Sequence, residues 1–333
     1  MVAPNLFGAY YELQIGLVGC GVLAAVMVGR ERRDRVARGR ESILWIAAAA
    51  ALAGYAIWLG HGVAVSLRNV RVTARNFYGQ LRVREADEED GMGVRRKLLH
   101  GVINHGEQIL RQDFRRRPGT YFCAQSGVGR LMNAMRQGSP RRVGVLGLGC
   151  GTLAAYGRSG DVFRFYEINP LVRQLATSQF TFLQDSAARV EIVLGDGRLM
   201  LEREPPQNFD VLVMDAFSGD SVPVHLITRE AFQVYLHHLK PDGVLALNIS
   251  NRYLNFQPVM AQAARAFGKV ALLADYKADE EDLECFSSSW VLMMEERTWA
   301  ALQPLLGEVK HLEARGDFRL WTDDYSSIFG ILR

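Results

Sequence analysis

The chain has 333 residues, of which 49% are hydrophobic and 23% are charged. This length suits two or more structural units, and this composition argues against a disordered chain. The 39 basic and 36 acidic residues leave a net charge of +3, which is too small a surplus to indicate nucleic acid as a partner.

Four cysteines are spread along the chain, with no CxxC pair and no histidine at metal-ligand spacing. We therefore expect reduced thiols and no metal site. Cys20 falls in an apolar run and Cys150 in a glycine-rich loop, and the other two are Cys123 and Cys285.

Two apolar stretches precede the rest of the chain. Residues 13–29 carry no charge, and residues 43–67 carry none apart from His61. Each is close to the length that crosses a bilayer. The segment before them lacks the basic residues expected ahead of a signal-peptide core. We expect residues 1–67 to form a membrane region with two hydrophobic helices, and a buried hairpin is the alternative.

Residues 68–135 have the pattern of a small β-rich subdomain. Alternation over residues 75–85 (RNFYGQLRVRE) predicts a strand, and residues 85–90 (EADEED) predict an acidic turn. Residues 93–104 (GVRRKLLHGVIN) then predict paired strands.

Short apolar runs alternate with helical stretches in residues 136–333. This rhythm is typical of a parallel, doubly wound sheet that binds a nucleotide. We therefore expect an α/β domain over this range. The runs are 143–146, 162–166, 190–194, 211–214, 244–249, 270–273 and 291–294.

A glycine-rich turn follows the first of these runs. Gly147, Gly149 and Gly151 form a GxGxG pattern between a strand and an expected helix. Glycine allows such a turn to be tight and lets backbone N–H groups approach a ligand closely. No lysine follows at P-loop spacing, so this motif is not a P-loop, whereas NAD remains compatible with it.

Three acidic residues end the next three runs. Glu167, twenty residues after Gly147, suits two ribose hydroxyls, and Asp196, with Gly197 after it, suits an adenine amino group. Asp215 ends the fourth run, and its carboxylate suits a sulfonium or an amine better than a nicotinamide. Ligands bind at this edge of an open sheet. The alternative is that each acid is a helix cap or turn residue.

Taken together, these residues resemble the polyamine aminopropyltransferase (spermidine synthase) family, especially its bacterial membrane-attached branch. The resemblance covers residues 76–333 and includes YEIN at 166–169, LKPDG at 239–243 and SSSW at 287–290. It implies a Rossmann-like, class I methyltransferase-type parallel sheet with a small N-terminal β subdomain. It also implies an S-adenosylmethionine-type co-substrate, no metal, and a homo-oligomer.

The resemblance assigns roles residue by residue. Glu167 would hold the ribose, Asp196 the adenine, and Asp215 would be the catalytic acid that receives the attacking amine. Asn104, in HGVIN at 100–104, falls where the family usually has a glutamine that contacts the nucleoside.

The chain also departs from the family pattern. Cys150 stands where the family's glycine loop has an aspartate that holds the aminopropyl ammonium, and a neutral thiol cannot replace that charge. Gln125 and Ser126 stand where a Tyr-His pair frames the polyamine pocket. The second aspartate of the substrate loop is displaced to Asp220. Gln125 and Asp220 are therefore the candidate substrate-binding residues.

The leading hypothesis is transfer of an aminopropyl group from decarboxylated S-adenosylmethionine to an amine such as putrescine, with release of methylthioadenosine. A second hypothesis is an enzyme that uses ordinary S-adenosylmethionine for cleavage, aminocarboxypropyl transfer or methyl transfer, which Cys150 favours. A third is a membrane-tethered nucleoside sensor without chemistry, against which Asp215 argues. The expected partners are a small amine or none and a membrane, with no nucleic acid.

Two clusters of basic residues predict opposite membrane orientations. Residues 30–40 (RERRDRVARGR) contain six arginines, which the positive-inside rule places in the cytoplasm. Two spans would then put the C-terminal part on the other side, but a second basic cluster follows at residues 68–84. Because S-adenosylmethionine is made in the cytosol, we expect a multi-pass protein of the cell membrane with a cytoplasmic catalytic domain.

Overall fold

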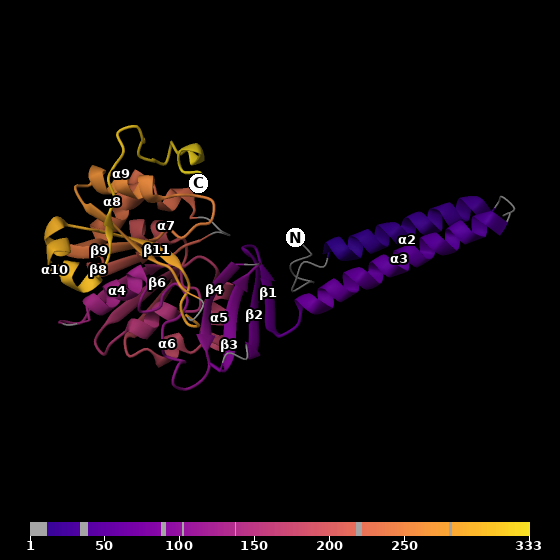
Figure 1. Ribbon diagram of the computed structural model, residues 1–333, viewed down its shortest axis with the longest axis horizontal. Helices are drawn as coiled ribbons and strands as arrows, with labels where there is room; N and C mark the ends of the chain where they lie inside the picture. Colours follow the sequence, from indigo (N-terminus) through magenta and orange to yellow (C-terminus); the bar gives the residue numbers. More distant parts are fainter. Residues whose placement is uncertain are drawn as a thin grey trace. The chain divides into compact units, whose positions relative to one another are not determined.

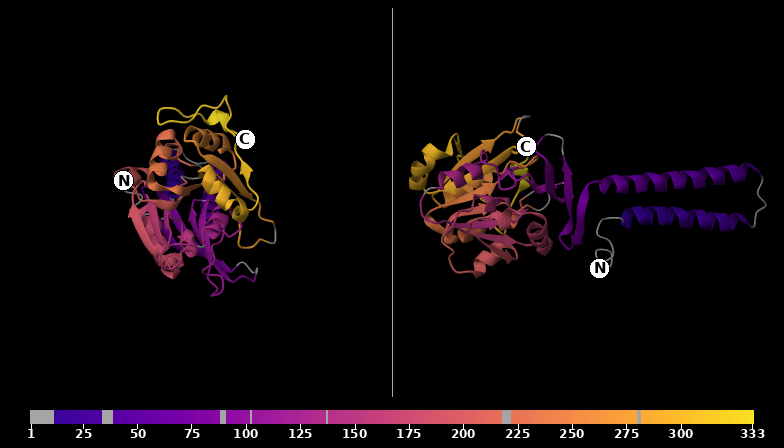
Figure 2. Two further views of the ribbon diagram at one scale, coloured as in Figure 1. Left: turned by 90° about the vertical axis from the view of Figure 1, so that its left-hand side faces the viewer. Right: turned by 90° about the horizontal axis from the view of Figure 1, so that it is seen from below.

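The computed structural model describes residues 12–33, 39–87, 91–101, 103–136, 138–217, 222–279 and 282–333. The chain divides into two compact units, Met1–Arg84 and Glu85–Arg333. Figures 1 and 2 show their elements, coloured along the sequence. The domain boundaries expected from the sequence, after residues 67 and 135, stay a prediction.

Two helices, α2 (Glu12–Arg33) and α3 (Gly39–Ser66), lie side by side in the first unit. Their apolar side chains face outward: Ile57 and Trp58 of α3 are 73% and 67% exposed. Residues Ile46–Ser66 are long and apolar enough to cross a membrane, whereas the apolar part of α2, Glu12–Met27, is shorter. The expectation of two spanning helices is therefore corrected to one candidate among the described residues.

Two antiparallel hairpins follow the helices. The first joins β1 (Val70–Asn76) to β2 (Gly79–Asp87), and the second joins β3 (Val94–His100) to β4 (Ile103–Ile109). The single strand predicted over residues 75–85 is wrong, because the chain turns at Phe77 and Tyr78. The Tyr78 N–H donates to the Asn76 side chain at 3.0 Å, so an asparagine turn interrupts the alternating pattern.

Eight strands form the sheet of the second unit, in the order β12-β10-β11-β9-β8-β5-β6-β7. Strands β5 to β9 pair in parallel, and β10, β11 and β12 join antiparallel. All seven predicted apolar runs lie in strands, but the last two are antiparallel rather than parallel. The strands are β5 (Arg142–Leu146), β6 (Val162–Glu167), β7 (Arg189–Leu194), β8 (Phe209–Met214), β9 (Leu239–Asn248), β10 (Val270–Tyr276), β11 (Ser288–Met294) and β12 (Lys310–His311).

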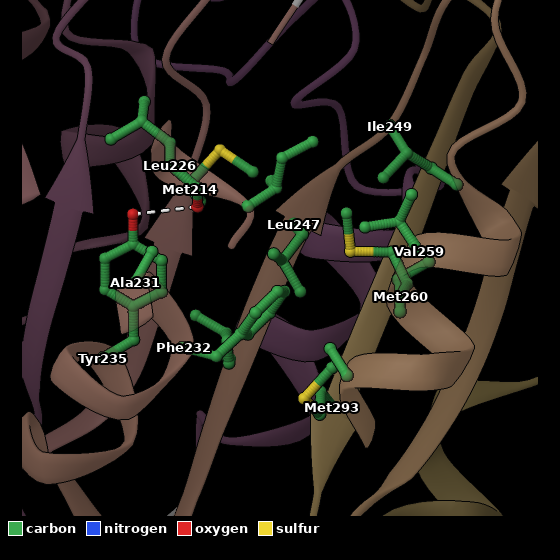
Figure 3. Close-up of a cluster of buried hydrophobic side chains, with 14 of the residues drawn as sticks. Met214, Leu226, Ala231, Phe232, Tyr235, Leu247, Ile249, Val259, Met260 and Met293 are labelled. Carbon is green, nitrogen blue, oxygen red and sulfur yellow. Dashed lines mark hydrogen bonds between the residues drawn. The ribbon is translucent and has the colours of Figure 1, made fainter. Parts of the chain in front are cut away.

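Helices cover both faces of this sheet, so its strands are apolar on both sides. Strand β8 illustrates this, because Leu212 and Met214 enter one buried cluster while Val211 and Val213 enter the other. Figure 3 shows part of the first cluster, where the Tyr235 hydroxyl donates to the Leu226 carbonyl at 3.0 Å. The first face carries α7 (Gly197–Arg203), α8 (Arg229–His238) and α9 (Gln257–Ala266), and the second carries α4 (Gly127–Ala134), α5 (Pro170–Gln179) and α10 (Glu296–Leu306).

Short helical turns complete the second unit. They are η1 (Thr152–Tyr156), α6 (Phe182–Asp185), η2 (Val224–Leu226) and η3 (Ile328–Gly330). The glycine loop after β5 therefore leads into η1, a single 3₁₀ turn, and not into the α-helix that the sequence pattern predicts.

A disulfide joins Cys123, between β4 and α4, to Cys285, between β10 and β11, with their Cα atoms 5.5 Å apart. The prediction of four reduced cysteines is wrong for this pair, while Cys20 and Cys150 are free thiols. The two segments pair through their backbones, because the Thr120 N–H donates to the Glu284 carbonyl at 2.7 Å. The disulfide joins residues 162 positions apart in the sequence, so no local spacing reveals it.

Removing this disulfide should destabilise the second unit. In the double variant Cys123→Ser, Cys285→Ser, a loop of 162 residues is no longer closed in the unfolded chain. The unfolded chain gains entropy, which lowers the free energy of unfolding by about 5 kcal/mol at most. Urea unfolding should show a lower midpoint for this variant than for the oxidised protein. Cys20→Ser, which removes an exposed free thiol, is the control. Equal midpoints for the double variant and the control would contradict this expectation.

Candidate functional site

The glycine loop brings two other segments against the end of β5. Gly147 and Gly149 have φ angles of 96° and 54°, a backbone region that favours glycine. A Cβ on Gly149 would lie 2.6 Å from the carbonyl oxygen of His105, and one on Gly147 would meet the backbone of Asp215. The loop therefore contacts β4 on one side and the end of β8 on the other. Gly151, with φ of 85°, closes the turn.

Glu167 ends β6 and holds the glycine loop. Its side chain is buried, with Oε2 accepting from the Leu148 N–H at 3.0 Å and Oε1 from the Asn169 N–H at 2.8 Å. Burial raises the pKa of this carboxyl, and the backbone hydrogen bonds oppose the rise. Each oxygen retains a second lone pair. The structure thus places Glu167 at the loop, and its contact with a ribose stays a prediction.

Asp196 caps a helix with one carboxylate oxygen and contacts a histidine with the other. Its Oδ1 accepts from the Leu199 N–H at 3.0 Å and so caps α7, while its Oδ2 lies 3.0 Å from Nε2 of His225. Gly197 begins α7, and a Cβ there would lie 2.9 Å from Leu146 of β5. The cap predicted as the alternative is therefore present, and it uses only one of the two carboxylate oxygens.

Asp215 follows β8 at the same edge. Its N–H donates to the Leu146 carbonyl at 2.9 Å, and its Oδ1 accepts from Nδ2 of Asn248 at 2.7 Å. Burial raises the pKa of this carboxyl to about 7, against the lowering effect of the Asn248 hydrogen bond. Near neutral pH this carboxyl can therefore both take up and release a proton.

Cys150 contributes no charge to the loop. Its thiol is 1% exposed and lies 3.1 Å from the Thr152 hydroxyl. Burial raises the thiol pKa to about 12, so the side chain is neutral at physiological pH. Gly106 of β4 packs against it, since a Cβ there would lie 2.5 Å from the sulfur.

Three further residues, Tyr121, His105 and Asn248, belong to this edge. Burial, followed by electrostatic interaction with Asp215 and Cys150, raises the pKa of Tyr121 well above its ordinary value. Nε2 of His105 is buried without a partner among the described residues, and burial followed by the charge of His100 lowers the imidazole pKa to about 4. Asn248 ends β9, so the strand-end pattern that identified Asp215 could also have identified it.

In the described part of the chain, the other candidates Asn104 and Gln125 make no hydrogen bond to Asp215. Asn104 turns back onto its own strand, where its Oδ1 accepts from the Gly106 N–H at 3.0 Å and its Nδ2 donates to Glu107 at 3.3 Å. Gln125 lines a cavity of about 490 Å³ with both disulfide cysteines, and Asp215 is not among the described lining residues. Asp220 lies outside the described residues.

A second cavity, of about 460 Å³, opens where β5, β6, β8 and β9 begin. Arg142 and Lys240 line it, but Lys240 pairs with Asp210 at 2.6 Å and Arg142 bonds Gln207. It lies at the opposite edge of the sheet from the glycine loop. Among the described residues, no three His, Cys, Asp or Glu side chains gather as metal ligands.

Several known proteins are similar to the chain. The polyamine aminopropyltransferase of Vibrio vulnificus is 29% identical over 211 residues, which are 56% of this chain and 68% of that protein. The N-terminal histidine N-methyltransferase of Emericella nidulans is 33% identical over 109 residues, which are 31% of this chain and 19% of that protein. No protein-family model matches the chain.

A crystal structure of a probable spermidine synthase from Corynebacterium glutamicum superimposes with a TM-score of 0.51 at 20% identity. The match covers 74% of this chain and 96% of that one. Together with the strand order, it confirms the predicted methyltransferase-type α/β fold with its mostly parallel sheet.

Replacing Asp215 by asparagine should stabilise the protein at alkaline pH. The native carboxyl has a pKa of about 7 against an ordinary value of 3.8, so the folded state binds its proton more tightly than the unfolded state. Stability from this group therefore falls as the pH rises from about 4 to 7. Asp215→Asn should match the wild type near pH 4 and exceed it at pH 8 by about 2–4 kcal/mol. Thermal melting of both proteins across this pH range measures the difference in their stability. A difference that does not grow as the pH rises would contradict this prediction.

Proposed function

We propose that this chain, which belongs to the polyamine aminopropyltransferase (spermidine synthase) family, transfers an aminopropyl group from decarboxylated S-adenosylmethionine to a small amine such as putrescine. The similarity to the Vibrio vulnificus enzyme supports the family and an enzymatic activity. The single observation that carries the reaction is the Asp215 carboxyl, whose pKa burial raises to about 7 beside the glycine loop.

The edge of the sheet fits the nucleoside part of such a donor. Glycine at 147 and 149 lets the loop pack closely against the backbones of Asp215 and His105, and the free lone pairs of Glu167 suit two ribose hydroxyls. Asp196 offers Oδ2 to an adenine amino group in exchange for His225. Ile168 and Leu199, each close in the chain to one of these acids, expose apolar side chains that suit a purine face.

Asp215 would accept the proton of the attacking amine. A carboxyl with a pKa of about 7 is a stronger base than an ordinary aspartate with its value of 3.8, although an aliphatic amine, with a pKa near 10, binds protons more tightly still. The amine must therefore approach as the free base, held by the carboxylate. The donor supplies an electrophilic carbon beside its sulfonium. As the N–C bond forms, the C–S bond breaks toward sulfur, methylthioadenosine leaves, and the N–H proton passes to Asp215.

Ordinary S-adenosylmethionine is the alternative donor. The buried thiol of Cys150 is neutral, so the glycine loop lacks the carboxylate that would hold an aminopropyl ammonium. The similarity to a methyltransferase over 109 residues also suits cleavage, aminocarboxypropyl transfer or methyl transfer. A nucleoside sensor without chemistry has less support, since the relatives are enzymes.

Products will distinguish the two donors. Purified full-length protein should convert decarboxylated S-adenosylmethionine and putrescine to spermidine and methylthioadenosine, measured by mass spectrometry. Asp215→Asn should lower turnover at least 100-fold, the scale of a lost general base, while methylthioadenosine still binds. Products from ordinary S-adenosylmethionine alone would establish the alternative. Unchanged turnover in Asp215→Asn would rule out the role given to this carboxyl.

Membrane attachment through α2 and α3 is part of the proposal, supported by the exposed apolar side chains of both helices. Self-association as a homo-oligomer is proposed from the family alone.

We assign the second unit to the cytoplasm, where its co-substrate is made. Cytoplasmic proteins rarely keep disulfides, so this assignment has a consequence for Cys123 and Cys285.

In growing cells, Cys123 and Cys285 should be thiols if the second unit is cytoplasmic. Rapid acid quenching followed by alkylation and peptide mass spectrometry should find both residues modified, with the disulfide forming after lysis in air. Cys150, buried and free, is the internal reference for full denaturation before alkylation. A pair that is already oxidised in quenched cells would place this unit outside the cytoplasm.

A further inference from the structure

Asn248 is the last residue of β9, and its side-chain amide is held at both ends. The side chain is buried, with Oδ1 accepting from the Ser250 N–H at 3.0 Å and Nδ2 donating to Asp215 Oδ1 at 2.7 Å. A backbone N–H can only donate and a carboxylate can only accept. These two partners therefore allow one orientation of the amide, with its nitrogen toward Asp215.

The turn that supports Asn248 is itself braced by the neighbouring strand. The Ser289 N–H of β11 donates to the Ser250 hydroxyl at 3.0 Å, and the Ile249 N–H donates to the Ser289 carbonyl at 2.9 Å. Strand β11 pairs with β9 up to Asn248, which lies opposite Trp290. The position of the Asn248 amide is therefore fixed by two strands, β9 and β11, that are hydrogen-bonded to each other.

Only one oxygen of the Asp215 carboxylate is engaged by this amide. Oδ2 has no hydrogen-bond partner among the described residues. It also does not belong to their fully buried polar atoms that lack a partner. Rotation of the carboxylate about its Cβ–Cγ bond would break the Oδ1 contact, so the contact also sets the direction in which Oδ2 points.

We propose that Asn248 is a positioning residue for the reaction of Asp215, engaging Oδ1 so that Oδ2 alone meets the attacking amine. The inference rests on the proposed function. It adds a second residue to the reacting centre, one that acts on the substrate only through Asp215.

The same hydrogen bond sets how readily Asp215 takes a proton. Burial raises the pKa of the carboxyl, and the Asn248 hydrogen bond is the opposing effect. Asp215 interacts electrostatically with Tyr121, whose own pKa lies well above its ordinary value and which also interacts with Cys150. Tyr121 and Cys150 are neutral near pH 7, so the Asp215 titration depends on burial and on Asn248.

Asn248→Leu removes the donor and keeps a branched side chain with the same number of heavy atoms. Losing the amide hydrogen bond to the charged carboxylate should raise the pKa of the Asp215 carboxyl by roughly one to two units. Infrared difference spectra across pH 5–9 measure this directly, from a protonated-carboxyl band that Asp215→Asn eliminates. The acid limb of the kcat/KM profile should move by the same amount, with activity recovering at higher pH.

Ser250→Ala is the comparison variant, because it removes the hydroxyl that accepts from Ser289 and keeps the N–H that orients Asn248. Its infrared midpoint should move less than that of Asn248→Leu. An unchanged midpoint in correctly folded Asn248→Leu, or an activity loss that is uniform at every pH, would overturn the positioning role. A wild-type protein that forms no product would overturn the proposed function instead, and the infrared titration would still decide whether Asn248 controls the carboxyl.

Discussion

One buried carboxylate organises the edge of the sheet at which the candidate residues gather. Glu167 accepts one hydrogen bond from Leu148 in the glycine loop and another from Asn169 after β6, so the ends of β5 and β6 are tied to a single side chain. Without it, two buried N–H groups would lose their partner, at a cost of about 1–3 kcal/mol each. The close approach of Gly147 to the Asp215 backbone then locates the end of β8 relative to the same loop.

The groups around that edge are mostly neutral. Burial keeps the Cys150 thiol and the Tyr121 phenol protonated and the His105 imidazole uncharged. Burial also raises the pKa of the Asp215 carboxyl to about 7, since charge is expensive to bury without a partner.

Local patterns predicted much of this arrangement, and long-range contacts account for what they missed. Apolar runs and the strand-end rule identified the strands and placed Glu167 and Asp215 correctly, because both depend on a few consecutive residues. The antiparallel direction of β10 and β11 is decided by pairing across the sheet, so an apolar run cannot reveal it. Tyr121 lies in a segment without regular spacing, and its electrostatic interaction with Asp215 arises only from the fold.

The Cys123–Cys285 bond has a topological consequence as well as an energetic one. It closes a covalent ring of backbone that contains α4 and every strand from β5 to β10. A single proteolytic cut anywhere between the two cysteines would open this ring without separating the pieces. The nicked, oxidised chain would remain one molecule, and the strands on either side of the cut would stay at high effective concentration for each other.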